Sequence, residues 1–358
     1  MPHWTRHLTG PVARTTVGIG VSTVFIVLFL RNTNFSGVAD AFTDANVALI
    51  LLAIVVYFAG IYARAIRWHY LLRHVQPIPP HKLFPIIAIG FGTNNILPLR
   101  AGEVIRAHTL YRRHGVRRAT GLSSIFMTRV FDGLMLTIFL TVGVIASLVS
   151  FEGMAYAGDL LLAAMAFLIF GVSAAFILIY LIATHPQQAN RRVLHLFARL
   201  PYLRHQSLDW LDSLIHGLAS TADRSLVFGA IWTSALAWGL EALMYYLVGE
   251  AFGLDLPFPV YLLVAAAANI IITAPSTSGG VGPFEWATKQ VLLIYVAGEN
   301  AEEVAIAYAA SLHGLVLIPI ALIGLSFLWV FHIPLRRLND TDLNDPNSTD
   351  ADPLPEPR

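Results

Sequence analysis

Residues 273–290 read TAPSTSGGVGPFEWATKQ and interrupt one of the most apolar parts of the chain with proline, serine, threonine, glycine and a glutamate. The overall composition is that of a membrane protein, because 56% of the 358 residues are hydrophobic and only 13% are charged. Soluble domains carry about 25% charged residues. Helix-breaking residues and a carboxylate thus stand at a depth where lipid would otherwise surround the chain, so the fold has to give them a polar environment.

Six apolar runs reach or approach the length of about 18 residues that a membrane-spanning helix needs. They are Thr15–Leu30, Ala45–Ile66, Leu122–Val149, Leu160–Ile182, Leu226–Gly249 and Val304–Phe331. The first run is the shortest, and the basic residues before it leave a signal peptide as the alternative interpretation. The only small-x-small pattern lies well past this run, at residues 39–41, which favours a retained span.

Two further apolar runs are too short to cross the membrane, and each one ends in helix-breaking residues. Leu83–Leu97 runs into TNNILPLRAGE, and Val260–Ala274 runs into TAPSTSGG. Another short helical stretch follows each break, Ala101–Tyr111 in the first case and Pro283–Val296 in the second. This order predicts two re-entrant helical hairpins, each of which enters the membrane and returns on the same side.

The distribution of basic residues predicts an orientation for this layout. If the first hairpin returns to the cytoplasm and the second returns to the outside, 20 of the 23 Lys and Arg residues fall on one side. The opposite loops are rich in Asp and Glu. Because cytoplasmic loops carry an excess of Lys and Arg, we expect a multi-pass protein of the cell membrane with both termini in the cytoplasm.

The order of spans and hairpins has an internal symmetry. Residues 15–150 read span, span, cytoplasmic hairpin, span, and residues 151–332 repeat that order from the opposite face. We therefore predict an all-α polytopic membrane protein with six transmembrane helices and two re-entrant hairpins in an inverted repeat. Residues 1–14 form a cytoplasmic N-terminus, residues 184–224 an amphipathic cytoplasmic loop, and residues 333–358 a disordered cytoplasmic tail.

The two breaks are the expected centre of any site. Non-helical backbone at membrane depth is tolerated only where it is buried in protein or lines a wet cavity. Gly279 and Gly280 permit a close approach of another group, and Glu285 falls in the first turn of the helix that opens at Pro283. The N–H groups of such a helix start can bind an anion. The alternative is that both breaks are structural turns.

Ionisable side chains within the predicted spans are costly, at about 3 kcal/mol each on insertion scales. Arg129 and Asp132 lie one turn apart in the third span and are expected to pair, either as a lock between helices or as part of a site. Glu241 lies in the middle of the fifth span with no basic residue near it in sequence, which favours a function. His313 in the sixth span is interpreted as an ordinary packed histidine.

The helices that leave the two breaks also carry charges at helical spacing. Arg100, Glu103 and Arg106 recur every three residues and share one helix face. Glu285 and Lys289 are four residues apart and are expected to pair. For this last pair the structural interpretation is favoured, because both side chains can reach the external interface.

The sequence carries no signature of an enzyme, a cofactor site or a metal site. The chain has no cysteine, no glycine-rich phosphate loop and no pair of histidines spaced for a metal on one span. We therefore expect no cofactor, no metal and no nucleic-acid partner. An intramembrane transferase that uses Glu103, Asp132, Glu241 or Glu285 as a base stays open as an alternative.

Three segments resemble the recurring motifs of one family. NNILPLRAGEVIRA (Asn94–Ala107), RVFDGLML (Arg129–Leu136) and APSTSGGVGPFE (Ala274–Glu285) are similar to motifs of the lysylphosphatidylglycerol synthase transmembrane-region family, also called flippase-like membrane proteins. The resemblance covers about residues 12–332 and implies a polytopic lipid-translocating module. In the bifunctional synthases this module precedes an aminoacyl-transferase domain. Here a short polar tail follows, so aminoacylation is not expected.

The residue patterns and the resemblance together predict a flippase-like protein that translocates a phosphate-bearing lipid. The alternative is a membrane-embedded glycosyl- or acyl-transferase component. Its expected partners are the lipid substrate, the membrane and a separate lipid-modifying transferase. The family implies a phospholipid, an aminoacyl-phospholipid or a polyprenyl-linked glycolipid as cargo. The candidate headgroup-binding residues are Asn94, Asn95, Arg100, Glu103, Arg106, Arg129, Asp132, Glu241, Ser276, Ser278, Gly279, Gly280 and Glu285.

Overall fold

The described part of the chain is a bundle of helices. The computed structural model describes residues 11–31, 33–97, 101–150, 166, 170, 224–272 and 278–331, and these residues contain helices and no strand. The elements, in chain order, are α2 (Pro11–Leu30), α3 (Phe35–Asp44), α4 (Val47–Leu72), α5 (Pro80–Ile96), α6 (Gly102–His114), α7 (Arg118–Ser150), α11 (Arg224–Ala251), α12 (Phe258–Ile271), the 3-10 turn η4 (Ser278–Gly280), α13 (Pro283–Leu292) and α14 (Ala301–Val330).

Four of these helices are long and apolar enough to cross a membrane, namely α4, α7, α11 and α14. They correspond to the second, third, fifth and sixth spans expected from the sequence. The helix of the first span is α2, which is bent by 82° against α3, and the two together make a fifth candidate. The fourth expected span, the loop at 184–224 and the polar tail lie outside the described residues, apart from positions 166, 170 and 224.

The outer surfaces of these long helices are apolar. Large hydrophobic side chains stand exposed on α4, α11 and α14, for example Val55, Trp232 and Leu322. In water such a surface would be unfavourable, whereas in a bilayer it faces hydrocarbon. The exposed apolar faces therefore identify the described bundle as multi-pass membrane protein.

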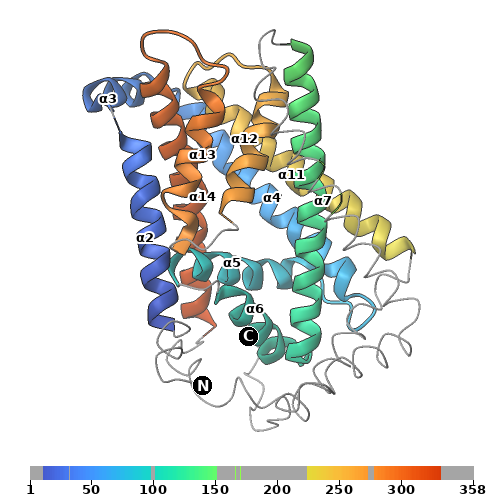
Figure 1. Cartoon of the computed structure of the whole chain (residues 1–358). Coiled ribbons are helices and arrows are strands. Elements are labelled where there is room, and N and C mark those ends of the chain that lie inside the picture. The colour runs from blue at the N-terminus through green and yellow to red at the C-terminus, as the bar shows by residue number, and fades with distance from the viewer. Residues whose placement is uncertain are drawn as a thin grey trace.

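The two short helix pairs occur where the sequence predicts the hairpins. Figure 1 shows α5 and α6 in the lower half of the bundle, with α5 lying across it, and α12 and α13 in the upper half. In the first pair α5 ends at Ile96 and α6 begins at Gly102, and in the second pair α12 ends at Ile271 and is followed by η4 and α13. The two helix pairs thus approach the middle of the bundle from opposite ends.

Small residues allow α5 to pack directly against α14. A Cβ atom added at Gly92 would lie 2.9 Å from the Ile320 carbonyl oxygen and 3.1 Å from the Gly324 Cα atom. On the other side of α5, the Gly102 N–H donates a hydrogen bond to the Asn94 Oδ1 atom at 2.8 Å, which closes the first hairpin. Glycines at these contacts bring three backbones close together, as is common between membrane helices.

Candidate functional site

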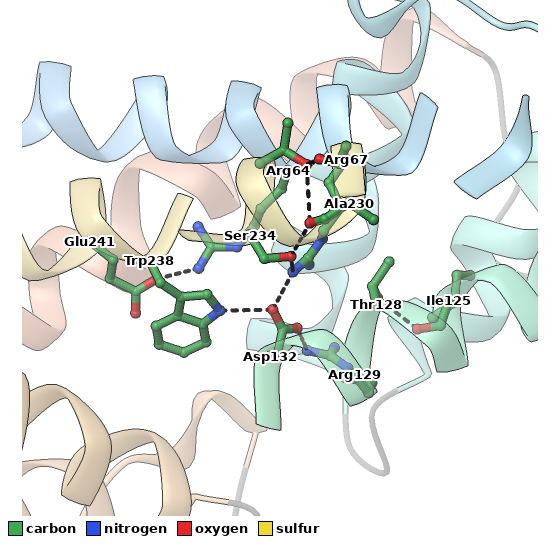
Figure 2. A network of polar contacts seen from close by, with 12 residues as sticks. Arg64, Arg67, Ile125, Thr128, Arg129, Asp132, Ala230, Ser234, Trp238 and Glu241 are labelled. Atoms are coloured by element: carbon green, nitrogen blue, oxygen red, sulfur yellow. Dashed lines mark hydrogen bonds and ion pairs between the residues drawn. The ribbon is translucent and has the colours of Figure 1, made fainter. Parts of the chain in front are cut away.

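Asp132 on α7 is the centre of a buried polar network (Figure 2). Its Oδ1 atom accepts hydrogen bonds from Arg67 Nη1 at 2.7 Å and from the Trp238 indole at 2.9 Å. Arg129, one turn earlier on α7, contacts the Oδ2 atom at 3.5 Å. The expected Arg129–Asp132 pair is therefore present, but the shorter ion pair is made by Arg67, which comes from α4.

Glu241 on α11 has a basic partner that lies far from it in sequence. It forms an ion pair with Arg64 of α4, and the Asn269 side-chain amide donates to its Oε1 atom at 3.3 Å. The partner was not recognised because Arg64 lies 177 residues away in sequence. Arg64 and Arg67 were counted as part of the positive cytoplasmic flank, although both side chains are buried.

The first hairpin adds two further charges from α6. Glu103 accepts two contacts from Arg129, at 2.8 Å from the Nε atom and at 2.7 Å from the Nη2 atom. The Arg106 guanidinium stacks on the Trp68 ring of α4, with 3.7 Å between the guanidinium carbon and the ring centroid. Arg106 is 6% exposed, and among the described residues it has no hydrogen bond or ion pair.

Among the residues that the structure describes, this network has one excess cation. Glu241 pairs with Arg64, Asp132 with Arg67, and Glu103 with Arg129. Arg106 is the fourth arginine, and its only partner among the described residues is the face of an indole, which attracts a cation but does not neutralise it. An uncompensated buried charge is costly, so the geometry is suited to an anion beside Arg106.

The second break is organised by Glu285 and His313, and this arrangement also differs from the expectation. Glu285 does not pair with Lys289, which instead binds Glu302 at 2.6 Å. The Glu285 Oε2 atom accepts from the Gly282 N–H at 2.7 Å, and its Oε1 atom lies 2.7 Å from His313 Nδ1. His313 is a buried, packed side chain as expected, and its ring also makes polar contacts, because its Nε2 atom lies 2.9 Å from the Gly279 carbonyl oxygen.

The two breaks meet against α14. Asn95, near the end of α5, donates from Nδ2 to the Leu317 carbonyl oxygen at 3.3 Å. A Cβ atom added at Gly279 would lie 3.1 Å from the Leu317 side chain and 3.5 Å from the Asn95 carbonyl oxygen. Gly279 and Gly280 have φ angles of 74° and 75°, which side chains rarely adopt. The glycines of the second break are therefore required for this close approach.

A row of contacts joins the arginine network to the second break. Asn269, which binds Glu241, also donates to the Tyr245 hydroxyl oxygen at 3.3 Å. The Tyr245 ring lies 6.5 Å from the Phe284 ring, and Phe284 stacks on His313 with 4.3 Å between centroids. The sequence-predicted residues thus fall into two linked groups, one around Asp132 and one around Glu285.

Some expected site residues have structural partners, and others fall outside the description. Asn94 and Asn95 use their side chains to tie the first break to Gly102 and to α14. Arg100, Ser276 and the side chain of Ser278 lie outside the described residues. Within the described residues, no group of three or more His, Asp or Glu side chains is arranged to hold a metal ion.

The described bundle has apolar outer faces, two short helix pairs that approach each other, and a buried arginine network. These features define a polytopic helical membrane protein with a charged interior. The profile of the lysylphosphatidylglycerol synthase transmembrane region matches residues 15–324. The chain therefore belongs to the lysylphosphatidylglycerol synthase transmembrane-region family.

Three relatives are similar to this chain in sequence. Two UPF0104 membrane proteins of Methanothermobacter thermautotrophicus are 25% and 26% identical, over 73% and 68% of this chain and 78% and 75% of their own lengths. The Glycosyltransferase AglD of Haloferax volcanii is 26% identical over 79% of this chain and 48% of its own length. No solved structure matches this chain.

Proposed function

We propose that this protein is a flippase-like transporter that moves a phosphate-bearing lipid across the cell membrane. The cargo class is a phospholipid, an aminoacyl-phospholipid or a polyprenyl-linked glycolipid. The chain would cross the bilayer six times and carry two re-entrant hairpins as inverted repeats, with both termini in the cytoplasm. The headgroup would pass through the polar interior, while the acyl or prenyl chains stay in the bilayer.

The observation that carries this proposal is that Arg106 has no ion-pair partner in the part of the chain that the structure describes. A guanidinium stays charged at any physiological pH and presents its N–H groups in a plane that matches a phosphate. The nearby Arg67 Nε atom also lacks a hydrogen-bond partner among the described residues. A phosphate beside Arg106 would neutralise the excess charge and take up donors that otherwise remain unsatisfied.

The surroundings of Arg106 favour a headgroup over a free anion. Arg106 and Glu103 lie on the helix of the first hairpin, and Arg129 and Asp132 lie on a long apolar helix that can face lipid. The interior of the described bundle carries these charges, and its outer faces carry exposed hydrophobic side chains. An amphipathic lipid has this same division between a charged headgroup and apolar chains.

The test is the movement of headgroups in proteoliposomes. The purified protein is reconstituted with a trace of headgroup-labelled phosphatidylglycerol, and a membrane-impermeant quencher reports the label on the outer leaflet. We expect the protein to increase the rate at which protected label becomes accessible. Equal rates in protein-containing and protein-free vesicles, for phosphatidylglycerol and for a polyprenyl-phosphate sugar, would contradict the proposal.

A second candidate function is a membrane-embedded component of a glycosyltransferase system. The similarity to AglD, whose name states a glycosyltransferase, favours it. In that case the chain would bind a lipid-linked sugar and support its transfer without moving headgroups. Sugar transfer that depends on this chain, together with no change in headgroup accessibility, would favour this second function.

A further inference from the structure

His313 makes two polar contacts that require more than one proton. Its Nε2 atom faces the Gly279 carbonyl oxygen at 2.9 Å, and its Nδ1 atom faces the Glu285 Oε1 atom at 2.7 Å. A carbonyl oxygen only accepts hydrogen bonds, so Nε2 must carry a hydrogen. The contact with Glu285 needs a second hydrogen, which sits on Nδ1 of an imidazolium or on Oε1 of a carboxylic acid.

Both arrangements contain the same number of protons and have zero net charge. Removal of one proton leaves a neutral imidazole beside a carboxylate, with a single N–H for two acceptors. One of the two contacts then brings two lone pairs face to face and is lost. Because a hydrogen bond to a carboxylate is stronger than one to a neutral carbonyl, the contact that is lost is the one to Gly279.

We infer that His313 and Glu285 form a binding site for one proton, and that this proton holds the second break against α14. With the proton bound, Gly279 is tied to His313 and lies against Asn95 of the first hairpin. Without it, Gly279 is released, and the contact between the two breaks loosens. The proton is a ligand that the proposed lipid translocation does not itself include, and its site does not depend on which lipid is carried.

Among the described residues, the charged groups on neighbouring elements are engaged elsewhere or absent from this contact. On α13, Lys289 binds Glu302 and the Phe29 carbonyl oxygen. On α11, Glu241 pairs with Arg64 of α4. On α3, Asp40 and Asp44 are exposed, and on α5 the basic residues stand in the first turn, at the end away from Asn95. Helix α12 carries no charged residue.

The packing around the pair explains why it can act as a defined site. His313 is 3% exposed and stacks on Phe284 with an angle of 18° between the rings. The Glu285 Oε2 atom is fixed by the Gly282 N–H at the start of α13. The imidazole therefore has little freedom to rotate away, and a change of protonation acts on its contact with Gly279 in η4.

The experiment measures how accessible the break is at different pH. The chain has no cysteine, so Val281→Cys introduces a single thiol next to Gly280. Its rate of reaction with a small maleimide is divided by the rate of Ser36→Cys, an exposed position on α3. This ratio removes the pH dependence that the two thiolates have in common. We expect the ratio to rise several-fold as the pH is raised and the shared proton is lost.

Two substitutions separate the proton site from a general pH effect. Glu285→Gln keeps an acceptor for the Gly282 N–H and supplies an N–H donor to Nδ1 without an extra proton, so the ratio should stay low at all pH values. His313→Gln cannot make both contacts at this geometry, so the ratio should stay high. Glu303→Gln, on the same helix as His313, is the matched control and should keep the wild-type profile.

The outcomes decide the inference without a transport assay. A flat wild-type ratio, or a Glu285→Gln variant with the wild-type pH profile, would contradict the proton site. If His313→Gln does not fold, the wild-type and Glu285→Gln profiles still decide the question. The wild-type protein could also show the expected pH profile of the maleimide ratio and yet move no lipid in the headgroup assay. This result would contradict the proposed transport function and would leave the proton site in place.

Discussion

Arg64 on α4 and Glu241 on α11 form a buried ion pair between two residues that are 177 positions apart in sequence. The pair lies between α4 and α11, beside the Trp238 ring, and Asn269 donates a further hydrogen bond to the carboxylate. Because Glu241 is neutralised by Arg64, it is not a free carboxylate available to bind an amine. The pair joins helices from the two halves of the chain.

Glu241→Gln is therefore expected to destabilise the protein. Removing one partner of a buried ion pair typically costs about 3–5 kcal/mol, because the other charge is left without a partner. The apparent unfolding temperature in detergent should fall, and it should recover in the double variant Arg64→Met, Glu241→Leu. The control is Glu299→Gln, which changes an exposed carboxylate. A Glu241→Gln protein as stable as this control would show that the pair contributes little.

A methyl group should be tolerated less well at Gly280, in the second break, than at Gly115, a glycine with a similar backbone conformation. Gly280 and Gly115 have φ angles of 75° and 70°. A Cβ atom at Gly280 would lie 2.7 Å from Ile272 Cγ2, whereas nothing lies within 4 Å at Gly115. Both alanine variants lose about 1–2 kcal/mol for the left-handed conformation, and Gly280→Ala alone adds a steric clash.

Unfolding temperatures in detergent test this comparison. Gly280→Ala should unfold at a lower temperature than Gly115→Ala, and Ile272→Ala should remove part of the difference when it is combined with Gly280→Ala. Equal temperatures for the two glycine variants would mean that the break can move away from Ile272 at no measurable cost.

The sequence predicted the positions of the helices better than it predicted which charged side chains form ion pairs. Apolar runs and breaks are local features, so α4, α7, α11 and α14 and the short pairs α5–α6 and α12–α13 were found close to their actual bounds. The partner of Glu241 could not be found in the same way, since an ion pair between distant segments depends on how helices pack. Glu285 and Lys289 had the right spacing to pair, but the start of α13 turns Glu285 towards Gly282 and His313.

One signal for the missed arginines was present. Arg64 and Arg67 lie one turn apart at the end of an apolar run, so they share a helix face that the apolar residues before them already bury. Two arginines on a buried face need buried acids, and Asp132 and Glu241 were the unassigned carboxylates within spans. Pairing the buried arginines of one span with the buried carboxylates of other spans predicts the Arg64–Glu241 and Arg67–Asp132 ion pairs.

The orientation expected from the basic residues is tested with single cysteines in this cysteine-free chain. Ser36→Cys and Gly298→Cys should react with a membrane-impermeant maleimide in intact cells, because they lie on the acidic side. Val75→Cys and Arg117→Cys lie on the basic side and should react only after the cells are opened. All four positions are exposed, so differences in burial do not confound the result. Labelling of Arg117→Cys in intact cells would reverse the orientation.

The central claim is that Arg106 binds the phosphate of a lipid headgroup, and the direct measurement is lipid movement by Arg106→Gln in proteoliposomes. The matched control is Arg113→Gln, because Arg113 lies on the same helix and also stacks on an aromatic ring, that of Phe331 at 4.2 Å. We expect Arg106→Gln to insert and fold but to lose most headgroup movement at every pH, while Arg113→Gln keeps it. Headgroup movement at the wild-type rate in folded Arg106→Gln would contradict the account.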